Sequence, residues 1–237
     1  MTNEPWRTHG EELTTRESEV QRMLADTTIP APQSLALDAT GASCGHPAHL
    51  MTLVPGRVSP ERVDAASRDA IAELLAAIHD VTPALDLREY QSWAWEAKFV
   101  VPAWASDASV WEAAFEVLRS PVPAYQPTFI HRDFQPRNLL WTGDAITGVV
   151  DWPETSLGPA WLDVAHCATN LAILHGTDVA DEFQRAYAAL TGREPQPYFD
   201  VMDIVGFLPP PGREGFITDP HQLANLEGRL AAVLPRV

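Results

Sequence analysis

The feature that most constrains the fold is the stretch 131–138, HRDFQPRN, together with Asp151, which stands thirteen residues further on in GVVDW. Between them lie two β-rich runs, 138–141 (NLLW) and 146–152 (ITGVVDW), separated by the turn-forming pair Gly143 and Asp144. Runs of this kind joined by a glycine-containing turn predict a β-hairpin. A hairpin would bring Asp151 back beside Asn138.

The side chains at these positions match one kind of chemistry. Asp133 and Asn138 have the H-R-D-x-x-x-x-N spacing that phosphoryl-transfer enzymes use to place a carboxylate at an acceptor hydroxyl and an amide oxygen at Mg²⁺. Phosphoryl transfer needs positioning and charge neutralisation, and oxygen ligands suit Mg²⁺. We therefore expect Asp133 to be the catalytic residue, and Asn138 and Asp151 to be metal ligands. Each residue alone could equally be a turn cap or a strand end.

The sequence HRDFQPRNLLW, the hairpin to VVDW and the following LGPAWLDVAH resemble the aminoglycoside phosphotransferase and choline kinase family. The resemblance runs from about Glu17 to the C-terminus and is most specific over residues 131–163. It implies an α+β, protein-kinase-like fold of two lobes, with Mg²⁺ and either ATP or GTP in the cleft between them. It does not fix the acceptor. It also implies antibiotic resistance as a biological role.

Composition limits the classes of partner. The chain has 237 residues with 32 acidic and 16 basic side chains, a net charge of −16, which argues against binding to nucleic acid or an anionic membrane. A cationic acceptor such as an aminoglycoside would suit this charge. Two cysteines form neither a metal-binding spacing nor a disulfide framework. With no apolar run long enough to span a bilayer, we expect a cytoplasmic protein.

The N-terminal region is expected to form a reduced nucleotide-binding lobe, residues 1–55, with a helix over residues 11–26 and two strands. Glu17 lies on the apolar face of that helix, and a carboxylate there requires a partner. By the resemblance, Glu17 corresponds to the helix glutamate that pairs with a phosphate-binding lysine, with Glu19 as the alternative.

The resemblance does not extend to the residues that precede this helix. A kinase needs a glycine-rich loop and a lysine-bearing strand there, whereas only about ten residues precede the helix and the sole lysine of the chain is Lys98. We therefore expect an N-terminally truncated form, whose activity is open. The sheet edge that truncation leaves exposed could pair with a second copy, so a homodimer is one alternative.

Residues 29–38 and 47–56 are expected to be strands, the second leading into an inter-lobe hinge at 52–56. By the resemblance, Thr52 and Val54 lie where backbone groups meet the adenine, and Met51 lines that pocket. Residues 56–237 are then a mainly helical C-terminal lobe that holds the catalytic loop 131–138 and the metal motif 149–152. Helices are expected after the Ser59 cap, from Ser106, and over 158–176, 178–192, 197–208 and 221–234.

Several residues of this lobe have less specific expectations. By the resemblance, Asp163 and His131 support the catalytic loop. His79 and His166 are expected to be structural. The acidic residues Glu154, Asp200 and Asp203 are weak candidates for binding a cationic acceptor. The tryptophans of residues 86–120 either pack in the core or stack on a substrate.

Two functions from different classes remain. The first is a small-molecule kinase that moves the γ-phosphoryl group of ATP or GTP to an acceptor hydroxyl. The second is a non-catalytic, pseudokinase-like binding protein, or an inactive fragment, that lacks the phosphate-clamping strands. The complete set Asp133, Asn138 and Asp151 favours the first, whereas the missing lysine and glycine-rich loop favour the second.

Overall fold

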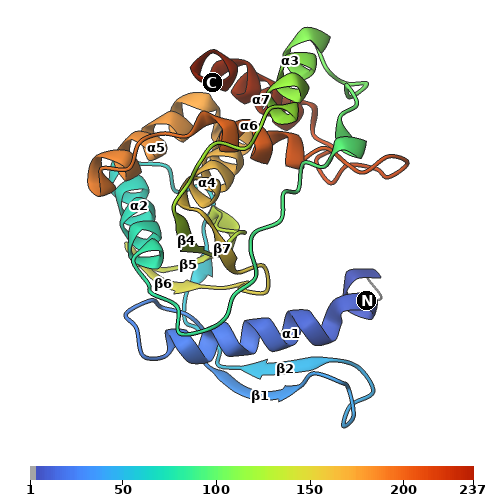
Figure 1. Cartoon of the computed structure of the whole chain (residues 1–237). Coiled ribbons are helices and arrows are strands. Elements are labelled where there is room, and N and C mark those ends of the chain that lie inside the picture. The colour runs from blue at the N-terminus through green and yellow to red at the C-terminus, as the bar shows by residue number, and fades with distance from the viewer. Residues whose placement is uncertain (1–3) are drawn as a thin grey trace.

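The computed structural model describes residues 4–237, with side chains from residue 9 onward. Helix α1 (Glu4–Leu24) packs against an antiparallel pair of strands, β1 (Ser34–Asp38) and β2 (Ala48–Met51). Figure 1 shows these three elements side by side at one end of the molecule, apart from most of the helices. Within residues 4–55, therefore, one helix and two strands form the N-terminal part.

The middle of the molecule contains two further small sheets. Strand β3 (Arg57–Val58) pairs with β5 (Leu139–Thr142), which forms an antiparallel hairpin with β6 (Ala145–Val149). The register places Leu139 opposite Val149, so the chain ends that bear Asn138 and Asp151 lie together. Strand β4 (Pro127–Ile130) pairs with β7 (Ser156–Pro159) and leads directly into the loop 131–138. The expected hairpin is thus present.

The larger part of the molecule is helical and is organised around α4 (Ala160–His175). Nearly every residue of this helix is buried, which is typical of a helix enclosed by others. It packs against α5 (Thr177–Thr191), α6 (Pro197–Gly206) and α7 (Pro220–Val233). Helices α2 (Ala65–His79) and α3 (Ala108–Arg119) complete the arrangement, and 3₁₀ turns span Glu96–Lys98, Pro136–Asn138 and Leu234–Arg236.

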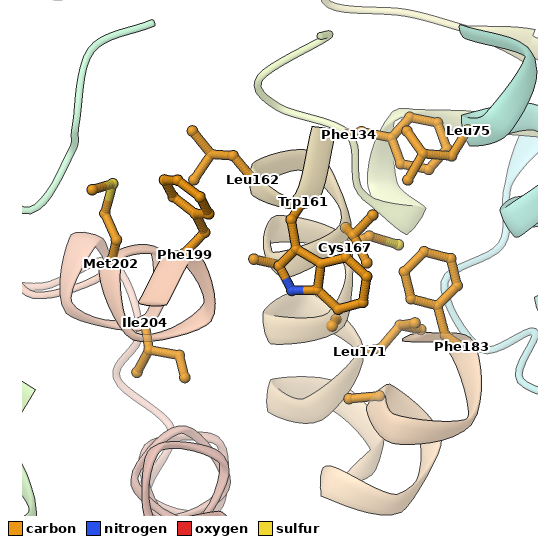
Figure 2. Packing of buried hydrophobic residues seen from close by; sticks show 14 of the residues in the cluster. Leu75, Phe134, Trp161, Leu162, Cys167, Leu171, Phe183, Phe199, Met202 and Ile204 are labelled. Atoms are coloured by element: carbon orange, nitrogen blue, oxygen red, sulfur yellow. The ribbon is translucent and has the colours of Figure 1, made fainter. Parts of the chain in front are cut away.

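The core surrounds α4. In Figure 2, Trp161 and Leu171 of α4 lie between Phe199 of α6 and Phe183 of α5. All four side chains are buried, and burial of a large apolar side chain contributes about 1.5–3 kcal/mol. This packing fixes the face of α4 that meets the catalytic loop.

Most expected elements are confirmed, with several shifted boundaries. The first helix covers Glu4–Leu24 instead of 11–26, and the strands expected over 29–38 and 47–56 cover Ser34–Asp38 and Ala48–Met51. The helix expected after Ser59 begins only at Ala65, because the Asp64 side chain accepts hydrogen bonds from the Ser67 backbone N–H and hydroxyl. The helix expected from residue 158 begins at Ala160, because Gly158 and Pro159 pair with β4. Asp107 is the N-cap of α3, and Gly192 ends α5 in the left-handed conformation, as the sequence predicts.

Candidate active site

Asp163, on the first turn of α4, holds the start of the catalytic loop. Its two carboxylate oxygens accept hydrogen bonds from the backbone N–H groups of His131 and Arg132, each at 2.7 Å. His79 Nε2 lies 3.2 Å from the same carboxylate, and its Nδ1 lies 2.6 Å from the Tyr187 hydroxyl. Asp163 therefore lies where the sequence placed it, and His79 is a buried hydrogen-bonding residue.

The loop turns sharply at Arg132, which has a φ of +73°, a conformation that costs a non-glycine residue free energy. The Arg132 side chain is buried, with its guanidinium 3.7 Å from the centroid of the Trp93 ring. One Nη also donates to the Gln91 carbonyl at 3.3 Å. These contacts hold the strained turn in place.

Asp133 follows this turn, and its carboxylate is held by three side chains. Oδ1 accepts from Gln135 Nε2 at 2.7 Å and from His166 Nε2 at 2.8 Å, and Oδ2 accepts from Asn138 Nδ2 at 3.0 Å. Burial raises the pKa of Asp133, but the hydrogen bond and charge of His166 outweigh burial and hold this pKa below its ordinary value. Asp133 is therefore an ionised, oriented carboxylate.

His166 is the residue of the site that the sequence analysis missed. Its Nε2 faces Asp133, and its Nδ1 lies 2.9 Å from Asp203 Oδ1, so both ring nitrogens donate, as only an imidazolium can. Burial lowers the pKa of His166, but the charge of Asp203 and the hydrogen bonds to both carboxylates raise it to about 10. The signal was its position three residues after Asp163, which places both on one face of α4.

Asn138 and Asp151 come together through the backbone, because the Val150 N–H donates to the Asn138 carbonyl at 3.0 Å. Asp151 itself has a φ of +73°, the second strained residue of the site. Burial, with the negative charges of Asp133, Glu17 and Glu154, raises the pKa of Asp151 to about 6. The hairpin thus places a carboxylate among other carboxylates.

His131 links these two parts of the site. Its Nδ1 accepts from the Asp133 N–H at 3.3 Å, and its Nε2 lies 3.1 Å from the Val150 carbonyl. One ring nitrogen accepts and the other donates, which is the pattern of a neutral imidazole. Burial lowers the pKa of His131 and favours this form.

The donor set suits Mg²⁺. Among the described side chains, no group donates a hydrogen bond to the Asp151 carboxylate or to Asn138 Oδ1, whose amide nitrogen is occupied by Asp133. Within the same residues no cluster of three His, Cys, Asp or Glu side chains could hold a metal. Mg²⁺ commonly takes only one or two protein oxygens and completes its shell with phosphate and water, so Asp151 and Asn138 fit it.

Glu17 connects α1 to the metal motif. One of its oxygens lies 3.4 Å from the Trp152 backbone N, and the other lies 3.3 Å from His49 Nδ1 on β2. Glu17 is buried whereas Glu19 is exposed, which favours Glu17 over its alternative. Its partner is a histidine of the neighbouring strand and not a lysine.

The expected hinge residues follow β2. The Thr52 N–H donates to the Gln33 carbonyl at 2.9 Å, so it is not free for a nucleotide, which corrects that part of the expectation. Met51 Sδ accepts from Gln21 Nε2 on α1 at 3.4 Å. Val54 lies over Gly148, where a Cβ would come within 2.5 Å of it. Met51 and Val54 therefore pack against neighbouring elements.

A cavity of about 650 Å³ opens at Asp133. Its wall includes Gln135 and Arg137 of the catalytic loop and His166 of α4. The remaining residues come from the segment before α3, from α4, from the C-terminal end of α6 and the loop after it, and from the first turn of α7. These are Trp93, Trp95, Lys98, Asn170, Ile173, Leu174, Gly206, Phe207, Phe216, Ile217 and Gln222.

Two of the tryptophans of residues 86–120 line this cavity. Trp111 is fully buried and its Nε1 donates to Glu227 Oε2 at 2.8 Å, whereas Trp93 and Trp95 face the cavity. Trp93 also lies edge-on to His166, with ring centroids 5.4 Å apart. Trp111 therefore packs in the core, and stacking on a substrate stays a prediction for Trp93 and Trp95.

The acidic residues expected to bind a cationic acceptor do not line the cavity. Asp200 is buried and accepts from Trp161 Nε1 at 2.7 Å, from Gln184 and from Arg229. Asp203 is buried beneath His166. Glu154 pairs with Arg88 at 2.5 Å. The expectation for all three is corrected, because each carboxylate is already neutralised or hydrogen-bonded away from the cavity.

Comparison with known proteins agrees with this geometry. Residues 7–198, most of the chain, match the family model described as "Phosphotransferase enzyme family". The chain belongs to this phosphotransferase family. The resemblance seen in the motifs is therefore confirmed, and the chain is a member of an enzyme family.

Solved structures similar to this phosphotransferase share its fold. A putative aminoglycoside phosphotransferase from Ralstonia eutropha is 18% identical with a TM-score of 0.65, covering 95% of this chain and 84% of that one. A complex of aminoglycoside phosphotransferase APH(4)-Ia with ADP and hygromycin B is 16% identical with a TM-score of 0.61, covering 95% and 82%. The expected α+β, kinase-like two-lobed fold is thus confirmed.

Curated relatives are longer proteins. The probable acyl-CoA dehydrogenase IBR3 of Arabidopsis thaliana is 30% identical over 181 residues, which are 64% of this chain and 22% of that protein. Acyl-CoA dehydrogenase family member 10 of Mus musculus is 27% identical over 173 residues, 64% of this chain and 16% of that protein. The matched segment thus covers less than a quarter of each of these relatives. Within the described residues of this phosphotransferase, no helix has the length and apolar character needed to span a bilayer.

Proposed function

We propose that this phosphotransferase is a small-molecule kinase that moves the γ-phosphoryl group of ATP or GTP to a hydroxyl of an acceptor bound in the cavity at Asp133. The observation that carries the proposal is the position of Asp133, which forms part of the cavity wall and is joined to the candidate metal ligand Asn138 by a hydrogen bond. Structures similar to this chain include complexes with ADP and GDP, which supports a nucleotide donor.

Asp133 is suited to orienting the acceptor. Its Oδ2 accepts only from Asn138 among the described residues, and a carboxylate oxygen can accept a second hydrogen bond. The acceptor hydroxyl would donate there, its oxygen forming the new O–P bond while the bond to the nucleoside diphosphate breaks. Because the pKa of Asp133 is lowered, it is a weak base, so it would take the proton late and act mainly by positioning.

Asp151 and Asn138 would hold Mg²⁺, as their unoccupied oxygens allow. When bound there, Mg²⁺ would neutralise the negative charge that accumulates on the leaving diphosphate. The residues themselves contribute by position: Asp151 has a strained backbone with a φ of +73°, and Glu17 contacts the backbone N–H of the next residue, Trp152. His131 would keep the two loops in register.

The second candidate is a nucleotide-binding protein without transfer activity. It is favoured by the partner of Glu17, which is His49 and not a lysine able to hold phosphates. It is opposed by the presence of Asp133, Asn138 and Asp151 in one site. The cytoplasmic location, a role in antibiotic resistance and dimerisation through β1 and β2 all stay predictions.

Titration of the purified 237-residue protein with Mg·ATP and Mg·GTP by calorimetry tests the proposal, with Asp151→Asn and Asp133→Asn as variants. We expect binding in the wild type and in Asp133→Asn, and loss of binding in Asp151→Asn. Hydrolysis of the nucleotide, with water in place of the acceptor, should fall about 10²–10⁴-fold in Asp133→Asn. Binding without any hydrolysis would favour the second candidate, and equal binding by Asp151→Asn would contradict the metal assignment.

A further inference from the structure

The cavity at Asp133 has an apolar, largely aromatic wall. Phe207 stacks on His166 with ring centroids 5.6 Å apart and an interplanar angle of 24°, and Phe216 lies 5.6 Å from Phe207. Trp93 and Trp95 form another part of the wall, with Ile173, Leu174 and Ile217. Aromatic faces bind flat or apolar bodies, so the acceptor has at least one apolar portion.

The charge of the wall is opposite to that of the chain. Acidic side chains outnumber basic ones by 32 to 16 in the whole sequence, yet the wall contains Lys98 and Arg137 against a single carboxylate, Asp133, which is already paired with His166. That carboxylate already accepts hydrogen bonds from three side chains. The cavity therefore offers little to a polycation.

Lys98 is the unusual member of this wall. The only lysine of the chain, it is 6% exposed. Its Nζ donates to the Gly206 carbonyl at 2.6 Å and lies 4.4 Å from the centroid of the Trp95 ring. Among the described residues no carboxylate lies within 4.0 Å of it. An ammonium has three N–H donors, and the protein occupies one of them with a carbonyl.

A buried ammonium without a carboxylate partner is costly unless a ligand supplies the counter-charge. Burial lowers the pKa of Lys98 to about 8, so the side chain is still charged at neutral pH. Arg137 adds a second cation to the wall: its side chain is exposed and makes no ion pair among the described residues. Both groups can satisfy an anion, and Lys98 can do so out of bulk water.

We infer that the acceptor of this kinase is an anionic hydroxyl compound, with an apolar or aromatic body against Trp93, Trp95 and Phe207 and a carboxylate-like group at Lys98. This inference rests on the proposed function, because it takes the cavity as the acceptor site. The acceptor would place its hydroxyl at Asp133, and its anionic group would serve as the counter-ion that the protein does not provide for Lys98.

Three probes of one shape test the charge. These are 4-(hydroxymethyl)benzoate, its methyl ester and 4-(hydroxymethyl)benzylamine, which carry charges of −1, 0 and +1 on the same ring and hydroxyl. Dissociation constants are measured at pH 7 on the full chain without nucleotide, by quenching of tryptophan fluorescence. Because the measurement involves no phosphoryl transfer, failure of the proposed function would not affect it.

Variants of Lys98 test whether this side chain binds the anionic group of the probe. Lys98→Gln removes the charge but keeps a donor for the Gly206 carbonyl, and Lys98→Arg keeps the charge. Arg22→Gln, an exposed position at the end of α1, controls for the loss of one positive charge far from the cavity. Circular dichroism confirms that each variant is folded.

We expect the carboxylate to bind about tenfold more tightly than the ester, which is the effect of one charge-assisted hydrogen bond, and the amine to bind most weakly. Lys98→Gln should reduce the difference between carboxylate and ester to about twofold or less on the same basis, whereas Lys98→Arg and Arg22→Gln should retain it. Tighter binding of the amine, equal binding of all three probes, or no binding of the carboxylate at millimolar concentration would overturn the inference. A preference that survives in Lys98→Gln would overturn the role of Lys98.

Discussion

The imidazole of His166 lies 2.8 Å from the carboxylate of Asp133, and on its other side it lies 2.9 Å from Asp203. Three residues from three parts of the chain thus form a line of alternating charge that ends in the cavity. Because the His166 imidazolium donates a hydrogen bond from each ring nitrogen, it stabilises the ionised form of Asp133 and fixes the direction of the Asp133 carboxylate. The carboxylate that we propose to orient the acceptor is therefore positioned from α4.

Replacement of His166 should impair turnover more than binding. Glutamine can donate one hydrogen bond but carries no charge, so His166→Gln frees Asp133 to rotate and raises its pKa. We expect hydrolysis of the nucleotide to fall about 10- to 100-fold, the cost of a displaced catalytic group, while calorimetry shows an unchanged nucleotide dissociation constant. The acid limb of the pH–rate profile should move to higher pH, which loss of packing alone would not cause. His175→Gln on the same helix is the control, and an unmoved profile would contradict the positioning role.

The raised pKa of His166 predicts that the folded protein loses stability as the pH becomes alkaline. The pKa of His166 rises from 6.5 in an unfolded chain to about 10 in the folded protein, so its contribution is complete below about pH 6.5 and is lost as pH rises toward about 10. Urea unfolding of the wild type at intervals from pH 6 to pH 10.5 should show this loss, and the difference from His166→Gln isolates it from other titrating groups. Parallel curves for the two proteins would show that His166 is not charged in the native state.

Arg229 should contribute strongly to the stability of the folded protein. Its partner Asp200 should not be required for ligand binding. Arg229 is fully buried and pairs with Asp200 and Asp181, so Arg229→Met leaves the Asp200 carboxylate buried without its cation. We expect a loss of about 3–5 kcal/mol in the free energy of unfolding, measured by urea titration. The double variant with Asp200→Asn should recover much of it. If Asp200→Asn alone weakened binding of the amine probe, Asp200 would be an acceptor ligand after all.

Glu17 and Glu19 provide a matched pair on α1. Glu17 is buried between His49 and the Trp152 N–H, whereas Glu19 is exposed. Glu17→Ala leaves both partners unsatisfied and should cost about 1–3 kcal/mol of stability, and Glu19→Ala should change it by less than about 0.5 kcal/mol. Thermal and urea unfolding of the two variants measure the difference. Equal effects would mean that Glu17 does not connect α1 to the metal motif.

The sequence by itself determined the local parts of the site. Asp133, Asn138 and Asp151 could be recognised because they stand at short spacings along the chain and are joined by a hairpin. The turn of this hairpin could be predicted from the adjacent residues Gly143 and Asp144. Asp163 could be placed by the same resemblance. The helices of the larger lobe were predictable because apolar spacing along a chain fixes the period of a helix.

Only the tertiary structure decided which distant side chains meet. Asp200 and Asp203 resemble surface acids in the sequence, but α6 packs against α4 and buries both, one against Arg229 and the other beneath His166. Lys98 and Trp95 lie in a segment without strong periodicity, and their position on the cavity wall depends on the Gly206 carbonyl at the end of α6. Burial and charge pairing across the core are properties of the packed helices, and no local pattern of residues encodes them.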